Sequence, residues 1–408
     1  MSELVSYFDI HKQFPDGSST ILGFLAISHT KEGRIIEQQF LYETDYLLNP
    51  MATEISPLMP LTKAGVQTFP SDGRAFVGFI DDLLPDDWGK KVIARRINKR
   101  HVTNLIALNY IGKSSSIGAC KITLDGENPD WSEGLELNRA HKIIQALHSG
   151  NIERLSQEEL EYTLLVQGGS AIGGARPKML VKDDDGFPCI IKPNQDSDKQ
   201  DIAALEWASL EVCRLAKLKT AEAHIYILNG TIKSLLIKRF DTTPEGGRKQ
   251  LTTINALLKD PNTQCDALYY SYEDIANCIR KYSWNVKEDL KQLFGAMLIN
   301  QALGNSDDHL RNFSMLSCAQ GWELSPIYDV LPHWPIHSEH ACTFDGSVYL
   351  PKLSDAINTG KKLGLNNADT LFVINNVAAA LSQWEALLTR NGITDQEVLN
   401  IPTKTQTR

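Results

Sequence analysis

The chain lacks the features that would mark it as secreted, membrane-spanning or built on disulfides. Its seven cysteines among 408 residues include no CxxC pair and form an odd total, which is typical of reduced thiols in a cytosolic protein. The first residues, MSELVSYFDIHKQF, lack the basic start and apolar run of a signal peptide. No segment approaches the roughly 18 uncharged apolar residues of a membrane span. We therefore expect a cytoplasmic protein with no membrane contact.

Positive charge is also scarce, with a formal net charge of −9. Nucleic-acid binding depends on neutralising phosphates, so this charge argues against a broad basic face for DNA or RNA. Any contact with DNA would then be indirect, through a basic partner. A content of 42% hydrophobic and 22% charged residues is ordinary for a globular protein, and 408 residues are enough for two or three domains.

The pattern of apolar residues predicts an α+β fold in three segments. Residues 1–125 are strand-rich, with short apolar runs such as ILGFLAIS between turn signals. Residues 126–241 contain a glycine-rich stretch, QGGSAIGGARPK, followed by two predicted hairpins around DDDG and NG. Residues 242–408 are mostly helical.

Two helices are predicted with particular clarity. The segment DIAALEWASLEVCRLAKL has one apolar stripe, with Asp201 placed to cap its first turn. In VKEDLKQLFGAMLINQALGN, the apolar residues Leu290, Leu293, Phe294 and Met297 follow helical spacing.

Taken in order, these segments contain the parts needed for phosphoryl transfer. Small residues in a glycine-rich loop let backbone N–H groups approach phosphate. Lys192, near the end of a predicted strand, supplies positive charge, and Glu206 lies on the helix that follows. Asn312 and Asp329 are candidates for holding Mg²⁺, which prefers oxygen ligands.

GNSDDHLRNF contains two adjacent aspartates, and spacing distinguishes them. Protein kinases place an asparagine five residues after the catalytic aspartate. Asp307 precedes Asn312 by five residues, whereas Asp308 precedes it by four. Asp307 is therefore the candidate for accepting or orienting the proton of a substrate hydroxyl. Asp308 is expected to stabilise a turn or to face solvent.

The chain resembles the HipA family, bacterial serine/threonine-protein kinase toxins with a kinase-like fold. Four blocks carry the resemblance across most of the chain: FIDDLLPDDWGKKVIARR, GGSAIGGARPKML, LLIKRFD and GNSDDHLRNFSML…LSPIYDVLP. It implies an enzyme that uses ATP and Mg²⁺ to phosphorylate a protein substrate, one such target being a glutamate–tRNA ligase, and so arrests growth, as in persistence. It also implies a small DNA-binding, HipB-like antitoxin as partner.

The resemblance implies roles at matching positions. Asp307 would be the catalytic base, and Asn312 and Asp329 would bind Mg²⁺. Lys192 would hold the ATP phosphates, with Glu206 fixing it. The remaining residues implied at the ATP site are Ala171, Gly173 and Gly174 of the glycine-rich loop, Lys238, Arg239 and Phe240 along the adenine, and His309 in the catalytic loop with Asn312.

One departure concerns the glycine-rich loop. The family usually carries a serine there whose autophosphorylation blocks ATP binding, but this chain has Ala171 at that position and Ser170 one place earlier. Three readings are open: Ser170 is the autophosphorylation site instead, the brake is missing, or the alanine is an introduced change.

Other functions stay open beside the kinase toxin. The chain could be a catalytically silent co-repressor that binds an antitoxin, a small-molecule phosphotransferase, or an enzyme that phosphorylates only its own Ser170. The histidine cluster HWPIHSEH is interpreted as a structural or substrate-facing segment, because Pro335 breaks the spacing and no zinc ligand set is complete.

Overall fold

The computed structural model describes residues 3–62, 65–70, 76–85, 87–110, 117–131, 134–163, 176–260, 269–333, 339–351 and 353–393. The chain forms two compact units, which are treated separately below. Unit 1 comprises Met1–Leu147, Asn151–Ile190 and Asp241–Asp266; unit 2 comprises His148–Gly150, Ile191–Phe240 and Ala267–Arg408.

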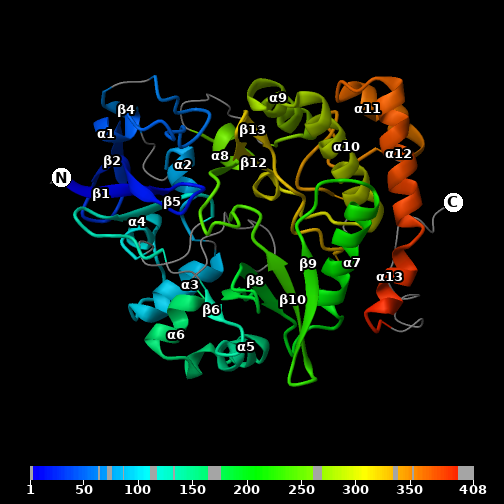
Figure 1. The fold of residues 1–408 in the computed structure, drawn as a ribbon, viewed down its shortest axis with the longest axis horizontal. Coiled ribbons are helices and arrows are strands. Elements are labelled where there is room, and N and C mark those ends of the chain that lie inside the picture. The colour runs from blue at the N-terminus through cyan, green and yellow to red at the C-terminus, as the bar shows by residue number, and fades with distance from the viewer. Residues whose placement is uncertain are drawn as a thin grey trace. The chain divides into compact units, whose positions relative to one another are not determined.

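Unit 1 is built on an antiparallel sheet with the strand order β4-β3-β2-β1-β5; β1, β2, β4 and β5 are labelled in Figure 1. Apolar side chains of these strands, such as Phe8, Ile10 and Leu25, are buried, and in β1 the burial is continuous from Phe8 to Gln13 rather than alternating. The elements of this unit are β1 Leu4–Gln13, β2 Ser19–His29, β3 Ile35–Tyr42, α1 Thr44–Leu47, β4 Gln67–Pro70, α2 Gly78–Asp81, α3 Asp87–Arg96, α4 Asn104–Leu108, β5 Cys120–Leu124, β6 Leu135–Glu136, α5 His141–His148, η1 Ile152–Arg154, α6 Gln157–Tyr162, β7 Met179–Lys182, β11 Leu251–Thr253 and α8 Ile254–Leu258.

Unit 2 combines a small sheet with a group of helices. Residues 191–193, the end of strand β8 (Pro188–Pro193), belong to this unit, and β8 lies next to β10, which pairs with β9. The other elements are α7 Ile202–Leu215, β9 Ala223–Leu228, β10 Ile232–Lys238, α9 Tyr272–Tyr282, α10 Val286–Leu303, η2 Leu310–Asn312, β12 Ser314–Cys318, β13 Gly321–Leu324, η3 Leu353–Asp355, α11 Ala356–Lys362, α12 Asn367–Leu381 and α13 Trp384–Arg390.

Helix α7 packs against β9 and β10 (Figure 1). The side chain of Asp201 accepts a hydrogen bond from the Ala204 N–H at 3.0 Å and so caps the first turn. Leu210 of the helix and Leu235 of β10 share an apolar cluster. This packing fixes the direction in which Glu206 leaves the helix.

Helix α10 is the central helix of unit 2, and nearly all of its side chains after Asp289 are buried. It contacts α7, α9 and α12. It ends at Gly304, whose φ of 71° is a left-handed conformation that glycine adopts at little cost. The chain therefore turns sharply into residues 305–313.

The structure confirms the α+β class, with a strand-rich beginning and a mostly helical second half. Both predicted hairpins, the Asp201 cap and the helix over residues 286–303 are present. The three segments expected from the sequence stay a prediction. Among the described residues, no single helix is long and apolar enough to cross a membrane; α12 and α13 pass that test only jointly, with a 41° bend between them.

Candidate active site

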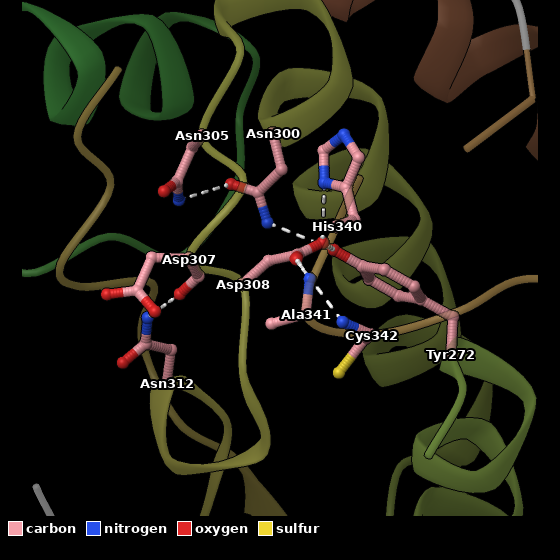
Figure 2. A network of polar contacts seen from close by, with 9 residues as sticks. All are labelled: Tyr272, Asn300, Asn305, Asp307, Asp308, Asn312, His340, Ala341 and Cys342. Carbon is pink, nitrogen blue, oxygen red and sulfur yellow. Dashed lines mark hydrogen bonds and ion pairs between the residues drawn. The ribbon is translucent and has the colours of Figure 1, made fainter. Parts of the chain in front are cut away.

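A loop directly after α10 carries the two aspartates (Figure 2). It is tied to the helix at its start, where the backbone N–H of Asn305 donates to the Asn300 carbonyl oxygen at 2.9 Å and Asn305 Nδ2 donates to Asn300 Oδ1 at 3.0 Å. At its end, Asn312 Nδ2 donates to the carbonyl oxygen of Asp307 at 2.8 Å. These bonds close the loop on itself and on the buried helix.

Asp307 lies in a partly buried and electrostatically unfavourable position. Its side chain is 18% exposed, and Oδ1 accepts no hydrogen bond within the described part of the chain. Burial, together with the charges of Asp329 and Asp308, raises the pKa of Asp307 from its ordinary 3.8 to about 7. Such a carboxyl group can gain and lose a proton near neutral pH, which suits a general base.

Asp308 has the opposite environment, with a completely buried side chain. Its carboxylate accepts hydrogen bonds from the Tyr272 hydroxyl at 2.6 Å, from the Ala341 N–H at 2.9 Å and from the Cys342 N–H at 3.4 Å, and it pairs with His340 Nδ1 at 3.0 Å. Of the two alternatives expected for Asp308, facing solvent is therefore wrong. The other expectation, that it stabilises the loop, agrees with these bonds.

Lys192 links two acidic side chains within unit 2. Its Nζ lies 2.7 Å from Glu206 Oε1 on α7 and 2.6 Å from Asp329 Oδ1. Burial lowers the pKa of Lys192, but the charges of Asp329 and Glu206 outweigh it and leave the pKa raised. The ammonium group therefore stays charged, held between a buried helix residue and a half-exposed aspartate.

The segment with Asp329 is positioned by the backbone at residues 219–221. Ile327 N–H donates to the carbonyl oxygen of Lys219 at 2.8 Å, and Ala221 N–H donates to that of Ile327 at 2.9 Å. Asp329 itself has a φ of 57°, a left-handed conformation that is strained for most residues but more accessible to aspartate. Strain of this kind is concentrated at functional sites.

Asn312 and Asp329 border the same small cavity. Because Asn312 Nδ2 is bonded to the loop backbone, its amide oxygen is directed away from that bond (Figure 2). No cluster of three or more His, Cys, Asp or Glu side chains suited to a metal occurs among the described residues. Mg²⁺ is commonly held by one or two carboxylates together with substrate phosphates and water, so this pair of oxygen donors fits the ion.

Of the residues expected beside the nucleotide, His309 lies close to Asp307. His309 Nε2 is 3.7 Å from Asp307 Oδ1, and neither of its ring nitrogens has a hydrogen-bond partner in the described structure. The ring of Phe240 packs on that of Tyr328 with centroids 5.5 Å apart, next to Asp329. Lys238 ends β10, where its Nζ lies 3.2 Å from Glu222 Oε1, and Arg239 is buried.

The structure thus brings together Asp307, Asn312, Asp329, Lys192 and Glu206 within one unit. The glycine-rich loop positions Ser170, Ala171, Gly173 and Gly174 lie outside the described residues.

Sequence reasoning missed Tyr272 and His340 as partners of the loop that follows α10. They lie 36 and 32 residues from Asp308 along the chain, and no local pattern indicates such a contact.

Comparison with known proteins agrees with the sequence resemblance. Residues 26–123 match the model of the HipA N-terminal domain, and residues 170–384 match the model of the HipA-like C-terminal domain. The second match alone spans more than half of the chain. The chain therefore belongs to the HipA family.

A solved structure shows the same fold. The chain is similar to a chain in the solved structure of the Shewanella oneidensis MR-1 toxin–antitoxin system HipA, HipB and its operator DNA. The two chains are 16% identical in sequence, with a TM-score of 0.66, and the match covers 96% of this chain and 94% of the Shewanella chain. This chain is also 34% identical over 61 residues to a protein of Sinorhizobium fredii named "Putative kinase Y4mE". That match spans 15% of this chain and 14% of the relative's length.

Proposed function

We propose that this protein is an ATP–Mg²⁺-dependent serine/threonine protein kinase and the toxin of a HipA-type toxin–antitoxin pair. The observation that carries the proposal is the contact of Lys192 with both Glu206 and Asp329, in the unit that also holds the Asp307–Asn312 loop. A lysine paired with a helix glutamate beside a metal-binding aspartate is the arrangement that protein kinases use for ATP.

In this proposal the residues of the site divide into those that would hold Mg²⁺ and those that would bind ATP. Asn312 and Asp329 would hold Mg²⁺, which supplies charge neutralisation on the phosphates of ATP. Lys192 contributes a permanent positive charge for those phosphates. His309 and the segment from Lys238 to Phe240 border the nucleotide.

Asp307 would act on the substrate hydroxyl. The hydroxyl oxygen attacks the γ-phosphorus of ATP, the bond between that phosphorus and the β–γ bridging oxygen breaks, and ADP leaves. The hydroxyl proton passes to the Asp307 carboxylate. Asp307 then releases this proton to water.

The proposed partners are a protein substrate and a small DNA-binding antitoxin of the HipB type. The second is supported by the fold shared with a HipA whose structure was solved with HipB and operator DNA. The acidic net charge is consistent with a chain that reaches DNA only through such a partner.

The test is transfer of labelled γ-phosphate from ATP–Mg²⁺ to proteins of a cell lysate, followed by mass spectrometry of the labelled residues. The wild type is compared with Asp307→Asn and with Asp345→Asn, a control because Asp345 is a surface residue, 65% exposed, whose carboxylate pairs with Lys362. We expect a discrete protein labelled on serine or threonine by the wild type and Asp345→Asn, and no label with Asp307→Asn.

Other outcomes would replace the proposal. Label only on small molecules would favour a small-molecule phosphotransferase. Label confined to Ser170 would indicate an enzyme that acts on itself. Nucleotide binding without any transfer, together with binding to an antitoxin, would favour a silent co-repressor.

A further inference from the structure

Asp308 is the centre of a buried polar network behind the catalytic loop (Figure 2). Taking a carboxylate out of water is costly unless hydrogen bonds replace its hydration. Here the two oxygens of Asp308 contact four groups from two other segments, the start of α9 and residues 340–342. The charge is therefore buried but well satisfied, and it binds the loop strongly to its surroundings.

The network continues beyond Asp308 into α10. The Tyr272 hydroxyl, which donates to Asp308, accepts a hydrogen bond from Asn300 Nδ2 at 3.1 Å. Asn300 Oδ1 in turn accepts from Asn305 Nδ2, so the chain of bonds returns to the start of the loop. A second connection reaches the loop backbone, where the Ala341 N–H also donates to the Ser306 carbonyl oxygen at 3.0 Å.

Asp307 and Asp308 are adjacent, and their side chains point to opposite sides of the loop (Figure 2). The side chain of Asp308 is anchored at four points, whereas Oδ1 of Asp307 has no hydrogen bond of its own within the described part of the chain. One peptide unit joins them, and its carbonyl oxygen accepts from Asn312. The orientation of the Asp307 side chain is consequently set by the hydrogen bonds that hold Asp308 and by the one from Asn312.

We propose that Asp308, with Tyr272 and His340 as its donors, is a positioning residue that fixes the backbone of Asp307 for proton acceptance. This inference rests on the proposed kinase function and adds residues to it. Asp308 does not touch substrate, since its side chain is completely buried. Its effect is on the geometry of the loop.

The variants separate positioning from folding. Asp308→Asn keeps the shape of the side chain, but it replaces one carboxylate oxygen, which accepts hydrogen bonds, by an NH₂ group, which can only donate them. Tyr272→Phe removes one donor and keeps the ring, which packs edge-on against Phe313 at 5.7 Å between centroids. At His340, asparagine can place an N–H where Nδ1 lies, whereas leucine cannot.

The experiment measures kcat and KM for ATP, the affinity for a non-hydrolysable ATP analogue with Mg²⁺, and amide hydrogen exchange in residues 304–313. A misplaced catalytic group lowers the rate without weakening substrate binding, so we expect kcat to fall roughly 100-fold in Asp308→Asn and roughly tenfold in Tyr272→Phe. KM and analogue affinity should stay within about threefold of the wild type. Exchange in the loop should become faster, and His340→Asn should retain more activity than His340→Leu.

Three results would overturn the inference. Wild-type kcat in both Asp308→Asn and Tyr272→Phe would show that the network does not position Asp307. Equal losses of kcat and analogue affinity in all variants would indicate general unfolding of the site. A wild type that transfers no phosphate would instead remove the proposed function, and the inference with it.

Discussion

Asp307 should make the folded protein less stable at neutral and alkaline pH, and replacing it should reverse this. A pKa rise from 3.8 to about 7 corresponds to roughly 4 kcal/mol of unfavourable free energy for the ionised carboxylate in the folded state. The folded state binds the proton of the Asp307 carboxyl group more tightly than the unfolded chain does. The free energy of unfolding therefore falls as the pH rises from about 4 to 7. Asp307→Asn removes the ionisation and therefore the penalty.

We expect Asp307→Asn to have a higher free energy of unfolding than the wild type at pH 8, by up to roughly 4 kcal/mol. The difference should decrease by more than half at pH 5, where the wild-type carboxyl is protonated in the folded protein. Urea unfolding followed by tryptophan fluorescence, without Mg²⁺ or nucleotide, measures both values. Asp345→Asn serves as the control, and it should show no comparable dependence on pH because its carboxylate is at the surface.

Two results would contradict this prediction: Asp307→Asn is no more stable than the wild type at pH 8, or its advantage in unfolding free energy does not change with pH. Either result would mean that burial and the neighbouring charges do not strain this carboxylate. A higher stability of Asp307→Asn that depends on pH would show that Asp307, a group able to accept a proton near neutral pH, lowers the stability of the folded protein.

Three further predictions concern the surroundings of Asp307. Lys192→Met removes the cation that contacts the buried Glu206, and it should weaken nucleotide binding in a titration and lower the unfolding free energy by roughly 3 kcal/mol. Gly304→Ala forces a side chain into a left-handed conformation at the end of α10 and should lower the unfolding free energy by about 1 kcal/mol, measured by urea unfolding. Asn312→Ala should raise the Mg²⁺ concentration for half-maximal phosphate transfer by roughly tenfold or more, and Asn312→Asp, which keeps an oxygen ligand, by less.

The parts of the fold that were predictable are those whose signals are local. The turns DDDG and NG lie between β-branched runs, and Asp201 stands directly before an amphipathic segment, so the hairpins and the cap of α7 follow from short stretches of chain. The contact of Lys192 with Glu206 was expected from their order and from the family resemblance. The second contact, with Asp329, is 137 residues away in the chain and depends on tertiary structure.

The environment of Asp308 shows where sequence reasoning stops. The spacing to Asn312 favoured Asp307 as the base, but it predicted neither the burial of Asp308 nor its hydrogen-bond partners. Its actual partners, Tyr272 and His340, come from α9 and from the last position of the histidine cluster HWPIHSEH. Two neighbouring aspartates therefore differ in burial and in hydrogen bonding for reasons that lie in distant parts of the chain.

The most direct test of the central claim is phosphate transfer by purified wild-type protein and Asp307→Asn to a labelled lysate protein, with nucleotide affinity measured in the same samples. We expect both proteins to bind ATP–Mg²⁺ with similar affinity and only the wild type to transfer the γ-phosphate. Transfer by Asp307→Asn at the wild-type rate would contradict the claim, because the base would then lie elsewhere.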